Sequence, residues 1–420
     1  MRQVSIKIDS LIIFMIMLFT ILISGTAVYS VEQFARLRDI TLIFLFFTLL
    51  YFFIKKTRKL NQKDLLITSG AVIFYCGSVI IHPSASVGNF FSKVLMFILY
   101  YFMFSISKNR EVFLLLFYRS VIFLAALALS FFIGLYLIRL PIPHFSMSNG
   151  LYNSYCYLFF NSENYRKAIG SFAFYRLQGV FWEPGVFAIY LILALYYYIY
   201  MAKNQNPKVL YLLLACLALT LSTTGIILGL LMIGVLFLKK YKNKNIRLLI
   251  IVPLGMTLCI AIYYVWTIKK EGEGSNSASY NIRLHDLKSS LSIWKSHLLF
   301  GTGYGNSSEF SMAKRKLHED GNSNGFLNWC MTMGVWGLIV QILPLMLNII
   351  NSKKKARIPY VVLALVYVGI NMSEPLITSP LMIMLLAFMY SILTSGNERI
   401  LRNEVKWEKN SAYLSEVLRI

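Results

Sequence analysis

Apolar runs long enough to cross a lipid bilayer recur along almost the whole chain, from Leu11 to residue 394. A spanning helix needs about 20 mostly apolar residues, because the hydrocarbon core is about 30 Å thick. Only 14% of the 420 residues are charged and 57% are hydrophobic, whereas about a quarter of the residues in a soluble domain are charged. These features exclude a water-soluble fold and predict an all-α polytopic membrane protein.

The lengths of the apolar runs predict about twelve transmembrane helices. The segment 209–238 is too long for one upright helix, and the polar residues 222–224 interrupt it at the middle. We interpret it as two short helices. A single tilted helix is the alternative, and it would invert the orientation of everything downstream. The predicted spans are 11–29, 40–54, 65–81, 91–106, 112–138, 184–201, 209–221, 225–238, 248–267, 326–350, 359–372 and 379–394.

The net charge of +23 is concentrated in short clusters between apolar runs, at 55–63, 239–247 and 353–357. Such clusters are typical of cytoplasmic loops that follow the positive-inside bias, and they argue against nucleic-acid binding. With a cytoplasmic N-terminus, twelve spans put all three clusters inside. Two long loops, about 139–183 and 268–325, then lie outside. We predict one membrane domain over 1–396, followed by a cytoplasmic tail, 397–420, that is either an amphipathic interfacial helix or disordered.

The first long loop ends in the segment RLQGVFWEPGVFA, which runs directly into an apolar helix. Pro184 suits the first turn of that helix, so Glu183 is predicted at its N-cap, where the helix dipole favours a negative charge. A capping role alone would explain Glu183. Because ionisable residues at the mouth of a membrane bundle tend to be functional, Arg176 and Glu183 are also candidate site residues.

The second long loop carries Arg283, His285, Asp286 and Lys288, followed by the segment SIWKSHLLFGTGYGN. The glycine pattern does not lie in a strand–helix unit, so we reject a dinucleotide site. Gly301, Gly303 and Gly305 would instead let backbone N–H groups approach a phosphate or glycan closely. The charged residues before them could equally form one exposed helix face without a role. The five cysteines are scattered, which argues against a disulfide framework.

These segments, taken in order, resemble the O-antigen polymerase/ligase superfamily. The resemblance rests on RLQGVFWEPGVFA, LSTTGI, Arg283 before LLFGTGYGN, and SNGFLNWCMTMGVWGL, and it covers about residues 170–340. It implies a GT-C-like membrane glycosyltransferase that transfers glycan from a polyprenyl diphosphate to an acceptor hydroxyl. No cofactor and no metal are implied.

The resemblance also implies roles for individual residues. Arg176 and Arg283 would hold the diphosphate, because the guanidinium fork matches phosphate geometry. Lys288, Asn324 and the three glycines would assist in binding the diphosphate or the glycan. The base that accepts the proton of the acceptor hydroxyl would be Glu183 or His297, with His318 behind them.

One departure from the family pattern bears on the reaction. Where the ligases carry His-Asn, this chain carries Ser323-Asn324. The resemblance therefore favours a polymerase of lipid-linked repeat units, which would make O-antigen, capsule or exopolysaccharide at the outer face of a bacterial inner membrane. A ligase is the alternative within the family. A transporter or lipid-linked-glycan flippase is the alternative from another class, although the chain shows no internal repeat. A chain-length regulator and a flippase are the pathway partners that the polymerase interpretation suggests.

Overall fold

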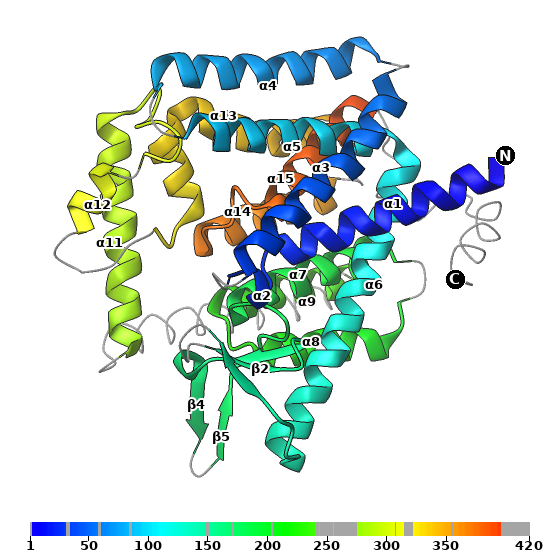
Figure 1. Cartoon of the computed structure of the whole chain (residues 1–420), viewed down its shortest axis with the longest axis vertical. Helices are drawn as coiled ribbons and strands as arrows, with labels where there is room; N and C mark the ends of the chain where they lie inside the picture. The colour runs from blue at the N-terminus through cyan, green and yellow to red at the C-terminus, as the bar shows by residue number, and fades with distance from the viewer. Residues whose placement is uncertain are drawn as a thin grey trace.

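In the computed structural model, helices occupy each predicted span whose residues are described (Figure 1). The structure describes residues 2–30, 34–57, 60–83, 86–147, 152–169, 172–202, 205–240, 243, 255, 275–306, 308–314, 322–353 and 357–395. The predicted span 248–267, apart from residue 255, and the predicted tail 397–420 lie outside these ranges.

Most of the helices are those that hydropathy predicts, and their bounds follow the apolar runs. They are α1 (Arg2–Ile23), α2 (Ala27–Ser30), α3 (Ala35–Thr57), α4 (Gln62–Ile81), α5 (Val87–Ser105), α6 (Ser107–Phe132) with a π-helical end (Ile133–Ile138), α7 (Pro184–Tyr200), α8 (Pro207–Leu219), α9 (Thr223–Lys240), α11 (Ser275–Ser296), α12 (Ser308–Lys314), α13 (Gly325–Asn351), α14 (Arg357–Ser373) and α15 (Pro380–Ser395).

Five helices in the described residues are long and apolar enough to cross a membrane, judged by length and composition. They are Ala35–Lys55, Gln62–Ile81, Val87–Ser105, Ser107–Ile138 and Gly325–Asn351. Shorter apolar helices, α7, α8, α9, α14 and α15 among them, accompany these five. The chain is therefore a multi-pass helical membrane protein, whereas the count of twelve spans and the orientation stay predictions.

The polar break inside 209–238 is present as predicted. α8 ends at Leu219 and α9 begins at Thr223. Between them Leu221 has a positive φ of 46°, a left-handed conformation that a β-carbon makes unfavourable. The hydroxyl of Ser222 accepts a hydrogen bond from the Gly225 N–H at 3.2 Å and so caps the start of α9.

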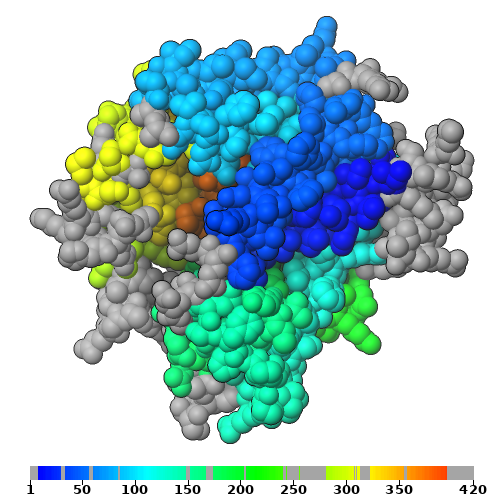
Figure 2. All heavy atoms as spheres, in the orientation of Figure 1, coloured from blue at the N-terminus to red at the C-terminus, as the bar shows by residue number. Residues whose placement is uncertain are grey.

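The first long loop contains short strands that the sequence analysis did not predict. β1 (Phe145–Met147), β2 (Tyr152–Tyr155) and β3 (Phe159–Asn161) form an antiparallel sheet in that order, while β4 (Arg166–Ile169) pairs with β5 (Phe172–Tyr175). Figure 2 shows the region of these strands as a lobe beside the N-terminal helices. The all-α expectation therefore describes the helical bundle but not this loop.

Helix α7 forms the centre of the bundle. It is apolar on all sides and nearly every residue is buried, as expected of a helix without a polar face. It packs against α6, α8, α9 and α14. Its N-terminus is therefore fixed in place from several sides, and the residues that precede it are fixed with it.

Candidate active site

Arg176 is held between the strands of the first loop and the α8–α9 break. Its backbone N–H donates to the Tyr165 carbonyl at 3.0 Å, and its guanidinium lies 5.6 Å from the centre of the Tyr165 ring. The Nε group donates to the Thr220 carbonyl at 2.8 Å. A carbonyl at a helix C-terminus has no partner inside the helix. The break after α8 thus supplies the acceptor that orients Arg176.

Arg283 reaches the same region from α11, which Figure 1 shows running crosswise to α4 and α13. Its Nη1 donates to the carbonyl of Ser373, the last residue of α14, at 3.4 Å. A cation at a helix C-terminus is favoured by the helix dipole. The contact joins the second long loop to the end of α14.

Two carboxyl groups converge on the start of α7. Glu183 occupies its N-cap and Pro184 its first turn, as predicted. A β-carbon on Gly185 would overlap the carboxyl of Glu374 and would lie 3.5 Å from Oε1 of Glu183. Glycine is therefore required at this position to let Glu374 approach the helix. Glu374 directly follows α14 and is 7% exposed.

Arg176, Glu183, Arg283 and Glu374 influence one another electrostatically, and together they are called the charge cluster below. Burial and, after it, the negative charge of Glu183 together raise the pKa of Glu374 to about 8, against the opposing effect of Arg283 and Arg176. Burial also raises the pKa of Glu183, but Arg283 and then Arg176 favour its charged form. At pH 7 Glu374 is therefore mainly protonated, and the two guanidinium cations leave an excess of positive charge beside Glu183 that suits an anionic ligand.

Glu374 was not among the predicted site residues. The sequence does carry a signal for it, because a Glu-Pro pair occurs twice at the border of an apolar run, at 183–184 and at 374–375. Sequence spacing alone could not show that these pairs meet, since 189 positions separate them and only the packing of α7 on α14 brings them together.

Asn324 and its neighbours fix the start of α13 against the cluster. Its side-chain oxygen accepts from the Leu327 N–H at 2.9 Å, which makes it a helix cap. A β-carbon on Gly325 would lie 2.6 Å from the Glu374 carbonyl. The hydroxyl and N–H of Ser323 donate to Oδ2 of Asp286 at 2.6 and 2.8 Å. Asn324 therefore lies beside the cluster in a structural role, and Asp286 ties α11 to α13.

Two other predicted site residues, the candidate base His297 and the candidate ligand Lys288, are set apart from Arg283 along or around α11. His297 lies just past the end of α11, roughly 20 Å along the helix axis from Arg283 at about 1.5 Å per residue. Lys288 is exposed on α11 and points to a different side from Arg283, because five residues turn an α-helix well past one full turn. His318 lies outside the described residues.

The three glycines of the second loop pack against protein instead of opening onto the cluster. All have positive φ, at 69°, 97° and 74° for Gly301, Gly303 and Gly305. The N–H of Gly301 donates to the His297 carbonyl and that of Gly303 to the Thr332 carbonyl, both at 2.9 Å. A β-carbon would meet α13 at Gly301, His82 at Gly303 and Ser86 at Gly305, so the three glycines allow close packing here, and α13 is itself broken at Gly334. Their approach to a phosphate stays a prediction.

The structure carries no group of three or more His, Cys, Asp or Glu side chains placed to hold a metal ion within its described residues. The chemistry available at the cluster is that of two guanidinium groups and two carboxyl groups at a helix N-terminus, and one of these carboxyls, Glu374, is mainly neutral at pH 7. Such a set can bind an anion and accept a proton.

Comparison with known proteins finds one family that matches the central part of the chain. Residues 209–342 match the family model described as O-antigen ligase. The match includes Thr220, Arg283 and Asn324, and it stops short of Arg176 and Glu374. No curated protein and no solved structure matched the chain. Over residues 209–342 the chain is therefore similar to the O-antigen ligase family.

Proposed function

We propose that this protein is a polymerase that joins polyprenyl-diphosphate-linked oligosaccharide repeat units into a surface polysaccharide at the outer face of a bacterial plasma membrane. The observation that carries the proposal is the convergence of Arg176 and Arg283 from two long loops, with Glu183 and Glu374, on the N-terminus of α7. The match of residues 209–342 to the O-antigen ligase family model supports a lipid-linked oligosaccharide as substrate.

In the proposed reaction, a hydroxyl oxygen of the acceptor unit attacks the anomeric carbon of the donor. The bond between that carbon and the diphosphate oxygen breaks, and polyprenyl diphosphate leaves with the electron pair. Negative charge therefore grows on the diphosphate, where Arg176, Arg283 and the positive end of α7 stabilise it. The hydroxyl proton passes to a carboxylate of the cluster.

Of the two carboxyl groups, Glu183 is the proposed base. Burial raises the pKa of Glu183, and both arginines oppose that rise by favouring its charged form; a carboxylate with a raised pKa is the stronger base for the hydroxyl proton. Glu374, with a pKa of about 8, keeps its proton at pH 7 and can donate a hydrogen bond to the glycan or the leaving phosphate. A neutral Glu374 also avoids a second negative charge beside the diphosphate.

A ligase is the second candidate, because the matched family model carries that description. The position where ligases have histidine holds Ser323, whose hydroxyl is engaged by Asp286. This arrangement leaves no side chain at that position that could accept a proton near neutral pH, and it favours the polymerase.

The experiment that tests the proposal replaces Arg283 by alanine in cells that make the polysaccharide. Loss of one cation that stabilises the leaving group is expected to lower polymerisation on the order of 100-fold or more. Single lipid-linked units should then accumulate, as seen by extraction and chromatography of the lipid fraction.

A matched control is Lys295→Ala, which removes an exposed cation from the same helix. It should leave polymer length and yield unchanged. Long polymer at the normal level in Arg283→Ala would contradict the proposed function. Accumulation of finished polymer still attached to the lipid carrier would instead identify a ligase.

A further inference from the structure

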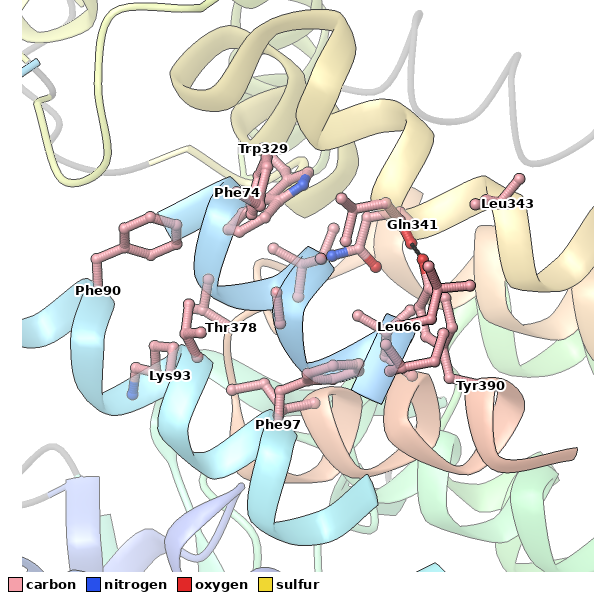
Figure 3. Close-up of a pocket in the computed structure, with 18 residues that line it drawn as sticks. Leu66, Phe74, Phe90, Lys93, Phe97, Trp329, Gln341, Leu343, Thr378 and Tyr390 are labelled. Atoms are coloured by element: carbon pink, nitrogen blue, oxygen red, sulfur yellow. Dashed lines mark hydrogen bonds between the residues drawn. The ribbon is translucent and has the colours of Figure 1, made fainter. Parts of the chain in front are cut away.

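An apolar cavity of about 380 Å³ lies between α4, α5, α13 and α15 (Figure 3). Aromatic and aliphatic side chains make up most of its wall, Phe74 on α4 and Phe97 on α5 among them. Its volume is within the range of about 300–1,000 Å³ that is typical of small-molecule sites. We refer to it as the α4–α13 groove.

The groove is open toward the surface of the bundle that would face lipid. Two of its wall residues, Leu66 on α4 and Leu343 on α13, are 71% and 42% exposed. Gly70 of α4 also lines the groove, and a β-carbon added there would meet nothing within 4 Å. An apolar chain can therefore enter sideways from the bilayer without passing through water.

One end of the groove carries positive charge. Lys93 of α5 is part of the wall, and Figure 3 shows its ammonium group at the edge of the cavity, directed away from the apolar centre. Arg38, on the adjacent helix α3, is close enough to repel it. Lysine side chains in membranes extend toward the head-group region. A ligand with an anionic head group and an apolar tail would complement both the cationic end and the apolar wall of the groove.

Aromatic residues at the Lys93 end of the groove indicate that this end lies at the membrane–water interface. Phe90 stacks on Tyr304 of the second loop at 4.8 Å between ring centres, and Tyr304 makes an edge contact with Trp329. Aromatic residues are enriched at the level of the lipid head groups. Lys93 lies one helical turn from Phe90, so its charge can reach that level.

The groove and the charge cluster share one short connection. Ile377 and Thr378, which line the groove, belong to the segment between α14 and α15 that begins with Glu374. A glycan whose lipid occupied the groove would emerge beside the connection that bears Glu374 of the charge cluster.

On the basis of the proposed function, we propose that the α4–α13 groove binds the polyprenyl chain of a second lipid carrier, the acceptor, with its phosphates at Lys93 and Arg38. Joining two carrier-linked units requires two diphosphates to be bound at once. Arg176 and Arg283 serve the donor, whose glycosyl–phosphate bond breaks. The acceptor reacts only through its sugar hydroxyl and keeps its own diphosphate bond, so its phosphates need positioning by cations and no proton transfer.

The test fills the groove without disturbing its walls. Gly70→Phe projects a ring into the cavity from a position with open space, whereas Gly77→Phe makes the same change on the same helix at a residue that does not line it. The probe is a polyprenyl diphosphate with a diazirine in its chain, photolysed with the purified protein in nanodiscs. Labelled peptides are then mapped by mass spectrometry.

In wild type and in Gly77→Phe, we expect labels at two places. One is the groove, on α4 or α13, and the other is the region of the charge cluster. Gly70→Phe should lose the groove label alone and lower polymerisation on the order of tenfold, the loss expected when about two methylene groups leave an apolar site. Lys93→Glu should likewise weaken the groove label, while Lys63→Glu, on the preceding helix and outside the groove wall, should not.

Two outcomes would overturn the inference. Either α4 and α13 are labelled equally in Gly70→Phe and wild type, or excess phosphatidylglycerol displaces the label, which would show that the groove holds only an ordinary bilayer lipid. Measuring polymerisation by Arg283→Ala beside Gly70→Phe separates the second-carrier site from the proposed function. If it is inactive while Gly70→Phe is fully active, only the second-carrier site fails. If Arg283→Ala retains full activity, the proposed function fails.

Discussion

At the residue scale, the charge cluster shows what local sequence can and cannot reveal. The N-cap position of Glu183 follows from Pro184 and the apolar run behind it, and the structure confirms it. The partnership of Glu183 with Glu374 could not be predicted, because it depends on α7 packing against α14. His297 was a reasonable candidate base by residue type, but α11 is a continuous helix that carries it far from Arg283.

The pKa of Glu374 predicts how activity responds to pH. Its pKa is raised to about 8, so the carboxyl is neutral below that pH and becomes charged above it. Activity should therefore decline as the pH rises through about 8, because a second negative charge then faces the diphosphate. Glu374→Gln, which stays neutral, should remain active and lose this alkaline decline in a pH profile of polymerisation.

Glu163→Gln, at an exposed carboxyl in the first loop, is the matched control and should keep the wild-type profile. An unchanged alkaline decline in Glu374→Gln would exclude Glu374 as its source.

At the scale of elements, hydropathy predicted the helices well and the irregular segments poorly. A run of about 20 apolar residues by itself predicts a membrane-spanning helix. The strands of the first loop are only three or four residues long, too short for an alternating pattern to stand out. The break in α13 at Gly334 is likewise invisible in the sequence. The break is stabilised by backbone hydrogen bonds between residues 298–303 and residues 331–335, whose backbone groups the break frees from the helix.

The break in α13 gives a prediction about stability. Gly334 has a φ of 63°, and a β-carbon there would overlap the carbonyl of Leu299. Gly334→Ala should therefore reduce the free energy of unfolding by about 1–3 kcal/mol, measured by thermal unfolding in detergent. Gly77→Ala, in open space on α4, should leave stability unchanged or raise it slightly. Equal stability of the two variants would show that the break is not maintained by glycine.

At the scale of the whole molecule, the two long loops meet at one end of the bundle. Arg176 follows the strands of the first loop and Arg283 comes from the second. The alternation of spans predicted that both loops share one side of the membrane, and their convergence on α7 is consistent with that. Which side it is depends on the distribution of basic residues, and it stays a prediction.

The side of the membrane can be tested with a cysteine that the chain already has. Cys156 is exposed in the turn between β2 and β3, Cys76 is exposed within the apolar helix α4, and Cys216 and Cys330 are buried. A membrane-impermeant maleimide should therefore label Cys156 in intact spheroplasts, and Cys156→Ser should abolish that labelling. Labelling of Cys156 only after permeabilisation would place the strands, Arg176 and Arg283 in the cytosol and exclude the proposed reaction.

The burial of α7 also bears on how ions in the medium act on the site. A helix end at a protein surface loses much of its field to mobile ions and water. α7 is enclosed along nearly its full length, so its field acts through a medium of low dielectric constant and reaches the phosphates almost unscreened. In the proposed reaction, the attraction of the helix for the leaving diphosphate would thus come from the backbone and depend little on the ionic strength of the medium.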